Sequence, residues 1–448
     1  MKFTKFGKAL LISALSAAVA LSITSCVQSY TVGYLYVTGT VTSQSSGNGI
    51  ISGYHIDHNT GKLSTVDGLP ISSGGANPVR AVLITGSRFL YVLNRGVNSS
   101  GGSDCTTADP CQNANITEFA VGGNGILTPE ETFYTQGINP FRMIGDTSGN
   151  FLYVLDHDAP DSNALTGGTA TTNTCTEALG SATTSCGDVT AFQVNQTTGR
   201  LSLVVNAQVT SASGAALPYF PVPANPIDFS LVSGYVLTLA GTPATGDTVF
   251  PYTYSSSTGQ LTINQNSAQT LSISQGTAIV PGGGFVYVLD NEGTDVAGSG
   301  ATSQILPYSV GTGGALQAQT GGAVADDATL ANPIYLLVES KGKFLYIANQ
   351  GNNVQGTNSG SGLSGYVIDP TTHQLSFIAG EPFGSGSGPQ CLVEDPSDQF
   401  VYSADFNDSS ITGRVVDPNS GVLNNLRVTS TYPLQGPATW CLIDGRTS

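Results

Sequence analysis

The sequence predicts an all-β protein whose mature part is a single seven-bladed β-propeller with four-stranded antiparallel blades. Three observations lead to this prediction. One tyrosine-containing strand recurs along the whole chain, each copy is surrounded by similar turns and strands, and the two chain ends carry complementary halves of one repeat. Self-similarity at a period of this length is typical of propellers and other repeat proteins.

The recurring strand places a tyrosine between apolar residues, as in Phe89-Leu-Tyr-Val-Leu-Asn. Its central tyrosines are Tyr36, Tyr91, Tyr153, Tyr287, Tyr346 and Tyr402. Neighbouring copies are about 55 to 62 residues apart, and the one wider gap, between Tyr153 and Tyr287, has room for a further repeat. The segment from Asn225 to Leu239 fits that degenerate copy, so the chain contains seven units.

Each repeat contains four strand segments. The same spacing separates a proline from the tyrosine in the pairs Pro78/Tyr91, Pro140/Tyr153, Pro333/Tyr346 and Pro389/Tyr402. An apolar strand and a turn lie between the two residues. A Gly/Asn/Ser-rich loop follows the tyrosine strand, and then come a strand such as 116–121, a tight turn such as 195–200 and a short Leu-Ser or Leu-Thr strand. Four short strands joined by hairpin turns correspond to one blade.

The chain ends are expected to share one blade. The first repeat begins at the tyrosine strand and lacks the strand before it, whereas the segment from Gly436 resembles the one from Gly388 and then the chain stops. The prediction is that 440–444 forms the innermost strand of the blade continued by 34–37. Ring closure of this kind removes the open edges that a stack of hairpins or an open solenoid would expose. The propeller is thus expected over residues 34–448, with 436–448 completing blade 1.

Residues 1–25 have the features of an export signal. Lys2, Lys5 and Lys8 precede an apolar run that is too short to be a transmembrane helix. The following Ile23-Thr-Ser-Cys resembles a bacterial lipobox, in which Cys26 would carry the lipid and 26–33 would be a short tether. The alternative is a plain signal peptide with an incidental cysteine. The prediction is a lipid-anchored protein of the bacterial cell envelope, at the outer membrane or cell surface, with the membrane as its partner.

Six further cysteines remain after Cys26, an even number that suits an oxidising compartment. Two pairs each share one loop, and the last two cysteines are left to pair over a long separation. The predicted disulfides are Cys105–Cys111, Cys175–Cys186 and Cys391–Cys441. For the third pair, two buried free thiols are the alternative.

The composition excludes several classes of partner. Lys and Arg number 14 against 30 Asp and Glu, a net charge of −16, and outside the signal no basic cluster exists. Nucleic-acid binding is therefore not expected. Met and Trp are scarce, which favours a monomer. The sequence lacks a phosphate-binding glycine loop and zinc-spaced ligands, so no cofactor or metal is predicted. Asp290-Asn-Glu-Gly-Thr-Asp has oxygen ligands at calcium-like spacing but lacks the closing glutamate of an EF-hand loop.

The Phe-Leu-Tyr-Val-Leu-Asn strands, Asn-Pro openings and Asp-Pro-x-x-Gly-x-Leu turns resemble those of the lactonase-type seven-bladed propellers, which include bacterial 6-phosphogluconolactonases and are related to YVTN-repeat surface proteins. The resemblance covers essentially all of 30–448. It implies a propeller and a lactone-opening or lactone-isomerising activity in carbohydrate metabolism. The Arg-His pair usual after the Gly-Pro opening is replaced here by Gln390-Cys391 and by Ala438-Thr439, which argues against lactone hydrolysis.

Strand order places the Asn-Pro loops and the loops after the tyrosine strands on one face of the disc. This face gathers two arginines, each two residues past its proline, and His157, which together are the candidate catalytic residues. The candidate binding residues are Asn94, Asp156, Asp290, Glu292, Asn349 and Asp405, and the two arginines are Arg80 and Arg142. An arginine pair could clamp a carboxylate or phosphate, or each arginine could instead form a salt bridge between blades. Asn and Asp also suit plain turn chemistry at strand ends.

Two functions follow. The first is a binding or scaffolding propeller that uses the loop-bearing face, where the loops 94–115 and 156–187 are long, to bind a protein, glycan or small molecule. The second is a lactonase-like enzyme acting in the central funnel through Arg80, Arg142 and His157. A fold alone does not decide between them.

Overall fold

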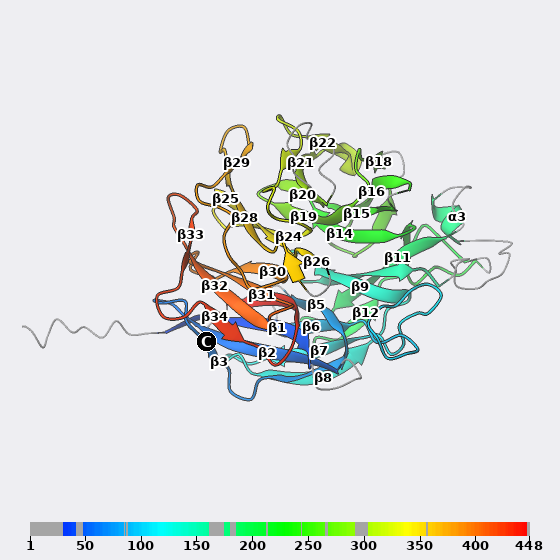
Figure 1. Ribbon diagram of the computed structural model, residues 1–448. Helices are drawn as coiled ribbons and strands as arrows, with labels where there is room; N and C mark the ends of the chain where they lie inside the picture. Colours follow the sequence, from blue (N-terminus) through cyan, green and yellow to red (C-terminus); the bar gives the residue numbers. More distant parts are fainter. Residues whose placement is uncertain are drawn as a thin grey trace, which may run out of the picture.

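The computed structural model describes residues 30–41, 48–84, 86, 88–160, 174–179, 185–211, 214–242, 244–264, 268–291, 303–354 and 357–445. Seven antiparallel sheets of four main strands each form the blades of a propeller, as predicted. Figure 1 shows the first strands of several blades, such as β9, β14 and β24, near the middle, and fourth strands such as β8, β22 and β29 at the rim.

The first four blades are built as follows. Blade 1 consists of β35 (Ala438–Asp444), β1 (Thr31–Thr40), β2 (Asn48–Asp57) and β3 (Leu63–Thr65), with β4 (Ile71–Ala76) beside β2. Blade 2 consists of β5 (Pro78–Leu83), β6 (Phe89–Asn94), β7 (Asn115–Val121) and β8 (Leu127–Phe133). Blade 3 consists of β9 (Ile138–Gly145), β10 (Phe151–Asp158), β11 (Cys186–Val194) and β12 (Leu201–Leu203), with β13 (Phe220–Pro223) beside β11. Blade 4 consists of β14 (Pro226–Val232), β15 (Tyr235–Thr242), β16 (Gly246–Tyr254) and β17 (Leu261–Ile263), with β18 (Gln269–Thr270) beside β16.

The remaining three blades repeat this plan. Blade 5 consists of β19 (Gly276–Gly282), β20 (Phe285–Asp290), β21 (Gln304–Val310) and β22 (Leu316–Ala318), with β23 (Val324–Ala325) beside β21. Blade 6 consists of β24 (Pro333–Val338), β25 (Phe344–Asn349), β28 (Gly362–Ile368) and β29 (Leu375–Phe377), and its loop holds the pair β26 (Asn352–Val354) and β27 (Thr357–Ser359). Blade 7 consists of β30 (Pro389–Glu394), β31 (Phe400–Asp405), β32 (Ser410–Val416) and β33 (Leu423–Asn425), with β34 (Thr431–Pro433) beside β32. In the part of the chain that the structure describes, the helical elements are α3 (Thr174–Leu179) and the 3₁₀ turn η2 (Thr312–Gly314). Within the described residues no helix is long and apolar enough to span a bilayer.

The recurring tyrosine joins five of the blades to the next blade. Its buried hydroxyl donates a hydrogen bond to the carbonyl of a glycine in the tight turn of the following blade. The pairs are Tyr36–Gly125, Tyr91–Gly199, Tyr153–Gly259, Tyr346–Gly421 and Tyr402–Gly61. Each of these glycines has a positive φ, which only glycine adopts without strain. The degenerate fourth repeat has Leu237 at the tyrosine position.

The predicted ring closure is confirmed. β35 pairs with β1 in the register Tyr34↔Asp444 to Val37↔Cys441, so the C-terminal strand is the innermost strand of the first blade. β1 begins at Thr31, slightly before the predicted start of the propeller, because Thr31 already pairs with Asp57 of β2. A disulfide between Cys391 of β30 and Cys441 links blade 7 to blade 1.

The other two predicted disulfides are also present. Cys105–Cys111 closes a short segment of the loop after β6, and Cys175–Cys186 ties α3 to the start of β11. The second bond lies in a small apolar cluster of its own with Leu217. The larger core clusters lie between neighbouring blades, such as the one that joins blades 7 and 1.

The Asn-Pro openings have a conformational cause. Asn77, Asn139, Asn225 and Asn332 all have φ between 51° and 59°, and Gly388 takes the same place in blade 7. Asparagine and glycine tolerate this left-handed region best, and the proline that follows starts the inner strand.

A β-bulge then interrupts the ladder in every inner strand. A bulge re-aims the side chain that follows it, and bulges are common beside binding sites. We call the residue after each bulge the ring position. The seven ring positions are Trp440, Arg80, Arg142, Asp228, Ala278, Tyr335 and Cys391 in blades 1 to 7.

Candidate functional site

A cavity of about 310 Å³ lies between the inner strands of blades 1 to 6. Five ring-position residues line it and give it its charge and aromatic surface: Arg80, Arg142, Asp228, Tyr335 and Trp440. The two predicted arginines are therefore brought together at the centre of the propeller. The other three residues were missed by the sequence analysis, although the same count from the proline in blades 4 and 6 leads to Asp228 and Tyr335.

Arg142 is engaged in a salt bridge between two blades. Its Nε lies 3.1 Å from Oδ1 of Asp228, and its Nη1 donates to the carbonyl of Phe141. The second carboxylate oxygen of Asp228 accepts the backbone N–H of Ile279 in blade 5 at 3.0 Å. Through these contacts the Arg142–Asp228 pair connects blades 3, 4 and 5. Arg142 therefore forms the salt bridge between blades that the sequence analysis gave as the alternative to a ligand clamp.

Arg80 is placed differently. Its guanidinium lies over the ring of Trp440, with Cζ 3.9 Å from the ring centroid, and its Nη1 donates to the carbonyl of Val79 at 2.8 Å. The Trp440 ring is itself held by a 3.1 Å hydrogen bond from Nε1 to the carbonyl of Ala81. Among the described residues no carboxylate lies within ion-pair distance of Arg80.

The charge of Arg80 is poorly compensated. Burial lowers the pKa of its guanidinium well below the usual value, and the positive charge of Arg142 lowers it further, against the opposing influence of Asp228. An arginine does not lose its proton in practice, so the lowered pKa reports how unfavourable the charged form is at this place. An anion in the cavity would relieve that cost.

Tyr335 completes the aromatic side of the cavity. Its ring stands at 90° to that of Trp440, with the centroids 5.1 Å apart, an edge-to-face contact. Burial raises the pKa of the phenol, which Arg80 opposes. Tyr335 is therefore neutral at physiological pH, and its hydroxyl can donate a hydrogen bond.

The predicted acceptor residues at the ends of the second strands lie elsewhere. Asn94, Asp156, Asp290, Asn349 and Asp405 are fully buried, and none of them lines the central cavity. Each has a partner in its own blade, such as Thr117 for Asn94, Thr190 for Asp156, Gln304 for Asp290, Ser364 for Asn349 and Thr412 for Asp405. Burial raises the pKa of the Asp405 carboxyl to about 6. These contacts are of the kind that order strand ends.

His157 does not reach the cavity either. Its Nδ1 lies 3.1 Å from Oδ2 of Asp158, and its ring packs beside Phe141, whose backbone is next to Arg142. Glu292, together with most of the calcium-like loop, lies outside the described residues, as do the signal segment and Cys26. Within the described part of the chain no group of three or more His, Cys, Asp and Glu side chains could hold a metal ion.

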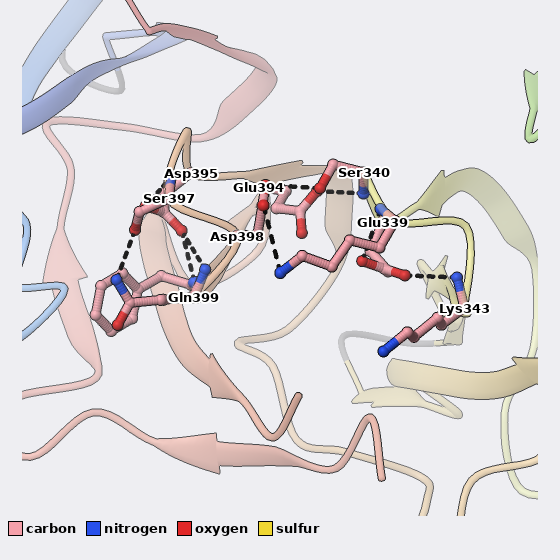
Figure 2. A network of polar contacts seen from close by, with 10 residues as sticks. Glu339, Ser340, Lys343, Glu394, Asp395, Ser397, Asp398 and Gln399 are labelled. Atoms are coloured by element: carbon pink, nitrogen blue, oxygen red, sulfur yellow. Dashed lines mark hydrogen bonds and ion pairs between the residues drawn. The ribbon is translucent and has the colours of Figure 1, made fainter. Parts of the chain in front are cut away.

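A polar network joins the turns of blades 6 and 7 at the other end of the inner strands (Figure 2). The backbone N–H of Ser340 donates to Glu394 at 2.7 Å, and the Ser340 hydroxyl donates to Asp398 at 2.6 Å. Lys341 forms an ion pair with Asp398 at 3.4 Å. Burial raises the pKa of Glu394 to about 7, although the hydrogen bond from Ser340 opposes this shift. These contacts stabilise the seam between two blades.

Comparison with known proteins agrees with this architecture. The family model described as "Lactonase, 7-bladed beta-propeller" matches residues 308–437. The chain resembles the lactonase-type propellers. The matched segment of this lactonase-like propeller contains Tyr335 but not the other four cavity residues named above. The match therefore supports the fold more directly than it supports a shared site. A search of curated protein sequences finds no match.

Several solved structures share the fold of this lactonase-like chain at low sequence identity. A periplasmic gluconolactonase from Pseudomonas aeruginosa is 17% identical with a TM-score of 0.61, covering 92% of this chain and 99% of its own. A candidate 6-phosphogluconolactonase from Bacteroides fragilis is 15% identical with a TM-score of 0.62, covering 92% and 98%. A protein from Lactobacillus plantarum is 16% identical with a TM-score of 0.62, covering 92% and 99%.

Proposed function

We propose that this propeller is a binding module that holds a small organic anion in its central cavity. One observation carries the proposal: Arg80 is a partly buried cation in the cavity wall, and no described carboxylate forms an ion pair with it. A buried charge without a partner is costly, so a protein retains it where a ligand supplies the opposite charge. A guanidinium favours carboxylate or phosphate because its donors match their geometry.

Binding is supported better than catalysis by the residues that line the cavity. A hydrolase needs a group that activates water, and such a group must be within hydrogen-bond reach of it. Asp228 is the acidic residue in the cavity wall, and its two oxygens already accept from Arg142 and Ile279. His157 lies outside the wall.

Lactone hydrolysis is the second candidate, favoured by the family model and by the similar gluconolactonase structure. In this case Arg80 would stabilise the oxyanion that forms when water attacks the lactone carbonyl. Hydrolysis of a lactone releases an acid, so the base needed to hold the pH constant with δ-gluconolactone or simple γ-lactones measures it. This measurement separates hydrolysis from binding alone. Enzymatic turnover that disappears in Arg80→Gln would support hydrolysis, whereas no turnover above the buffer rate would support a binding module.

The proposed location is the bacterial cell envelope, with a lipid on Cys26 as the anchor. The order of basic, apolar and small residues before Cys26 supports this, and three disulfides in the propeller suit an oxidising compartment.

The binding proposal is tested by calorimetric titration with a panel of carboxylates, sugar acids and phosphates. Arg80→Gln should weaken the best ligand at least tenfold, because it removes the charge and keeps much of the side-chain volume. Arg200→Gln is the matched control, since Arg200 is an exposed arginine in the β11–β12 turn that pairs with Glu131. The absence of binding for every anion, or equal binding by the Arg80 variant, would disprove the proposal.

A further inference from the structure

We infer that the preferred ligand of the central cavity is an aromatic carboxylate, and not a polyhydroxylated sugar acid. This inference rests on the proposed function and adds the chemical class of the ligand. It is based on the balance of polar and apolar groups in the cavity wall.

Most of the wall is apolar. Beyond the charged end, the residues that line the cavity are mainly apolar, namely Met143, Ile144, Phe229, Leu231, Ile279 and Val280. Contact between this surface and an apolar ligand body removes both from water, which is favourable in proportion to the area buried. A sugar carbon chain would bring its hydroxyls against the same surface and gain much less.

The polar groups left for a ligand are few. Each carboxylate oxygen of Asp228 already accepts one hydrogen bond, and Arg142 has part of its guanidinium engaged. Besides these two residues, Arg80, Tyr335 and Thr147 are the polar residues of the wall that remain as partners, because the Ser230 hydroxyl is too deeply buried to contact a ligand. A sugar acid carries about five hydroxyls besides its carboxylate, and a buried hydroxyl without a partner weakens binding. The cavity therefore selects against such a ligand.

Two aromatic side chains are positioned to contact a ligand ring beside the carboxylate. Trp440 is fixed by its bond to Ala81 and by the stacked Arg80, and Tyr335 stands perpendicular to it. Rings held in this way favour offset or edge-to-face contact with a further aromatic ring. A carboxylate bound by Arg80 would place its attached ring close to this pair.

The test is calorimetric titration of the full mature chain with 4-hydroxyphenylacetate, phenylacetate, 4-hydroxyphenylacetamide, D-gluconate and 6-phosphogluconate. We expect both aromatic acids to bind at least tenfold more tightly than either sugar acid and than the uncharged amide. Arg80→Gln should abolish the preference for the acid over the amide. Arg200→Gln, which changes an exposed arginine far from the cavity lining, should keep that preference.

The outcomes separate this inference from the proposed function. Binding of gluconate or 6-phosphogluconate as tight as that of the aromatic acids would overturn the inference and leave anion binding in place. Binding of none of the acids would overturn the proposed function. Aromatic acids that bind equally well to wild type and Arg80→Gln bind at some other site, and that result would also overturn the inference.

Discussion

The hydroxyl of Tyr402 donates a 2.7 Å hydrogen bond to the carbonyl of Gly61, 341 residues away in sequence. It joins the last blade to the first, and it repeats a contact made between four other pairs of neighbouring blades. The repeated tyrosine therefore has a structural role, because in five of the blades its hydroxyl donates a hydrogen bond to a buried carbonyl in the turn of the next blade.

Loss of this hydroxyl should destabilise the closed ring. Tyr402→Phe leaves the buried Gly61 carbonyl without its partner, which typically costs roughly 1–3 kcal/mol of the free energy of unfolding. Urea unfolding followed by circular dichroism measures the change. Tyr134→Phe is the control, because Tyr134 is 63% exposed and its substitution should have little effect. Equal midpoints for the two variants would contradict the structural role of the tyrosine.

The Cys391–Cys441 disulfide should stabilise the protein more than the Cys105–Cys111 disulfide, because it closes a longer segment of chain. Cys391 and Cys441 are 50 residues apart, whereas Cys105 and Cys111 are 6 apart. In the chain-entropy model the longer loop stabilises by about 2 kcal/mol more. Paired Cys→Ala variants compared by thermal unfolding measure this difference. A smaller loss for the Cys391/Cys441 pair would argue against its role in holding the ring closed.

The two cavity arginines should respond in opposite ways to substitution. Arg142→Gln removes the partner of a mostly buried carboxylate, and we expect the protein to lose roughly 1–3 kcal/mol of stability after allowance for partial exposure. Arg80→Gln removes an uncompensated charge and should leave stability unchanged or slightly increased, while anion binding is lost. Thermal unfolding without ligand measures both changes in stability. A larger loss of stability for Arg80→Gln than for Arg142→Gln would contradict a structural role for Arg142 and a ligand-binding role for Arg80.

Glu394 should make stability depend on pH. Its folded pKa of about 7 lies above the unfolded value of about 4.3, so the folded state retains a proton that the unfolded state releases. Its contribution to stability is thus complete below about pH 4.3 and is lost as the pH rises towards 7. Glu394→Gln cannot ionise and keeps an acceptor for Ser340, so its melting temperature relative to wild type should rise from pH 4 to pH 8. Glu130→Gln, at an exposed position, should show no such trend.

The proposed lipid attachment requires the thiol of Cys26. Cys26→Ser should release the protein from membranes into the soluble fraction, and mass spectrometry of the wild-type N-terminus should detect acyl chains. The propeller should lie close to the bilayer, because the few residues before β1 reach at most about 3.5 Å each. A wild-type protein with an unmodified N-terminus would contradict the lipobox interpretation.

The fold could be predicted from the sequence because its signals are local and repeated. A tyrosine, a turn glycine and an Asn-Pro opening recur in most repeats, and each is required by a contact or a dihedral angle within one or two blades. Ring closure followed from the match between the segments at Gly388 and Gly436. The pairing of Cys391 with Cys441 depended on the geometry of two inner strands and was open between a bond and free thiols until the structure placed the two Cα atoms 5.9 Å apart.

The site was predicted only in part. Arg80 and Arg142 drew attention because arginines are scarce and share a repeat position, but their different partners depend on which blades are adjacent. Asp228 and Tyr335 occupy the same position and were overlooked because each residue type occurs there once. Trp440 was obscured by the shifted register of β35. The strand-end acceptors fit both binding and turn chemistry by residue type, and only the three-dimensional structure shows their distance from the cavity.

The residues that recur from blade to blade and the ring positions after the bulges, which vary, lie at different places in each repeat. The tyrosine and the turn glycine that join neighbouring blades recur in most repeats, whereas the seven ring positions hold Trp, Arg, Arg, Asp, Ala, Tyr and Cys. Some ring positions also join blades, because Cys391 is bonded to Cys441 and Arg142 pairs with Asp228. Arg80 has no such ion pair among the described residues, so substitutions there would alter what the centre recognises at the least cost to the surrounding scaffold.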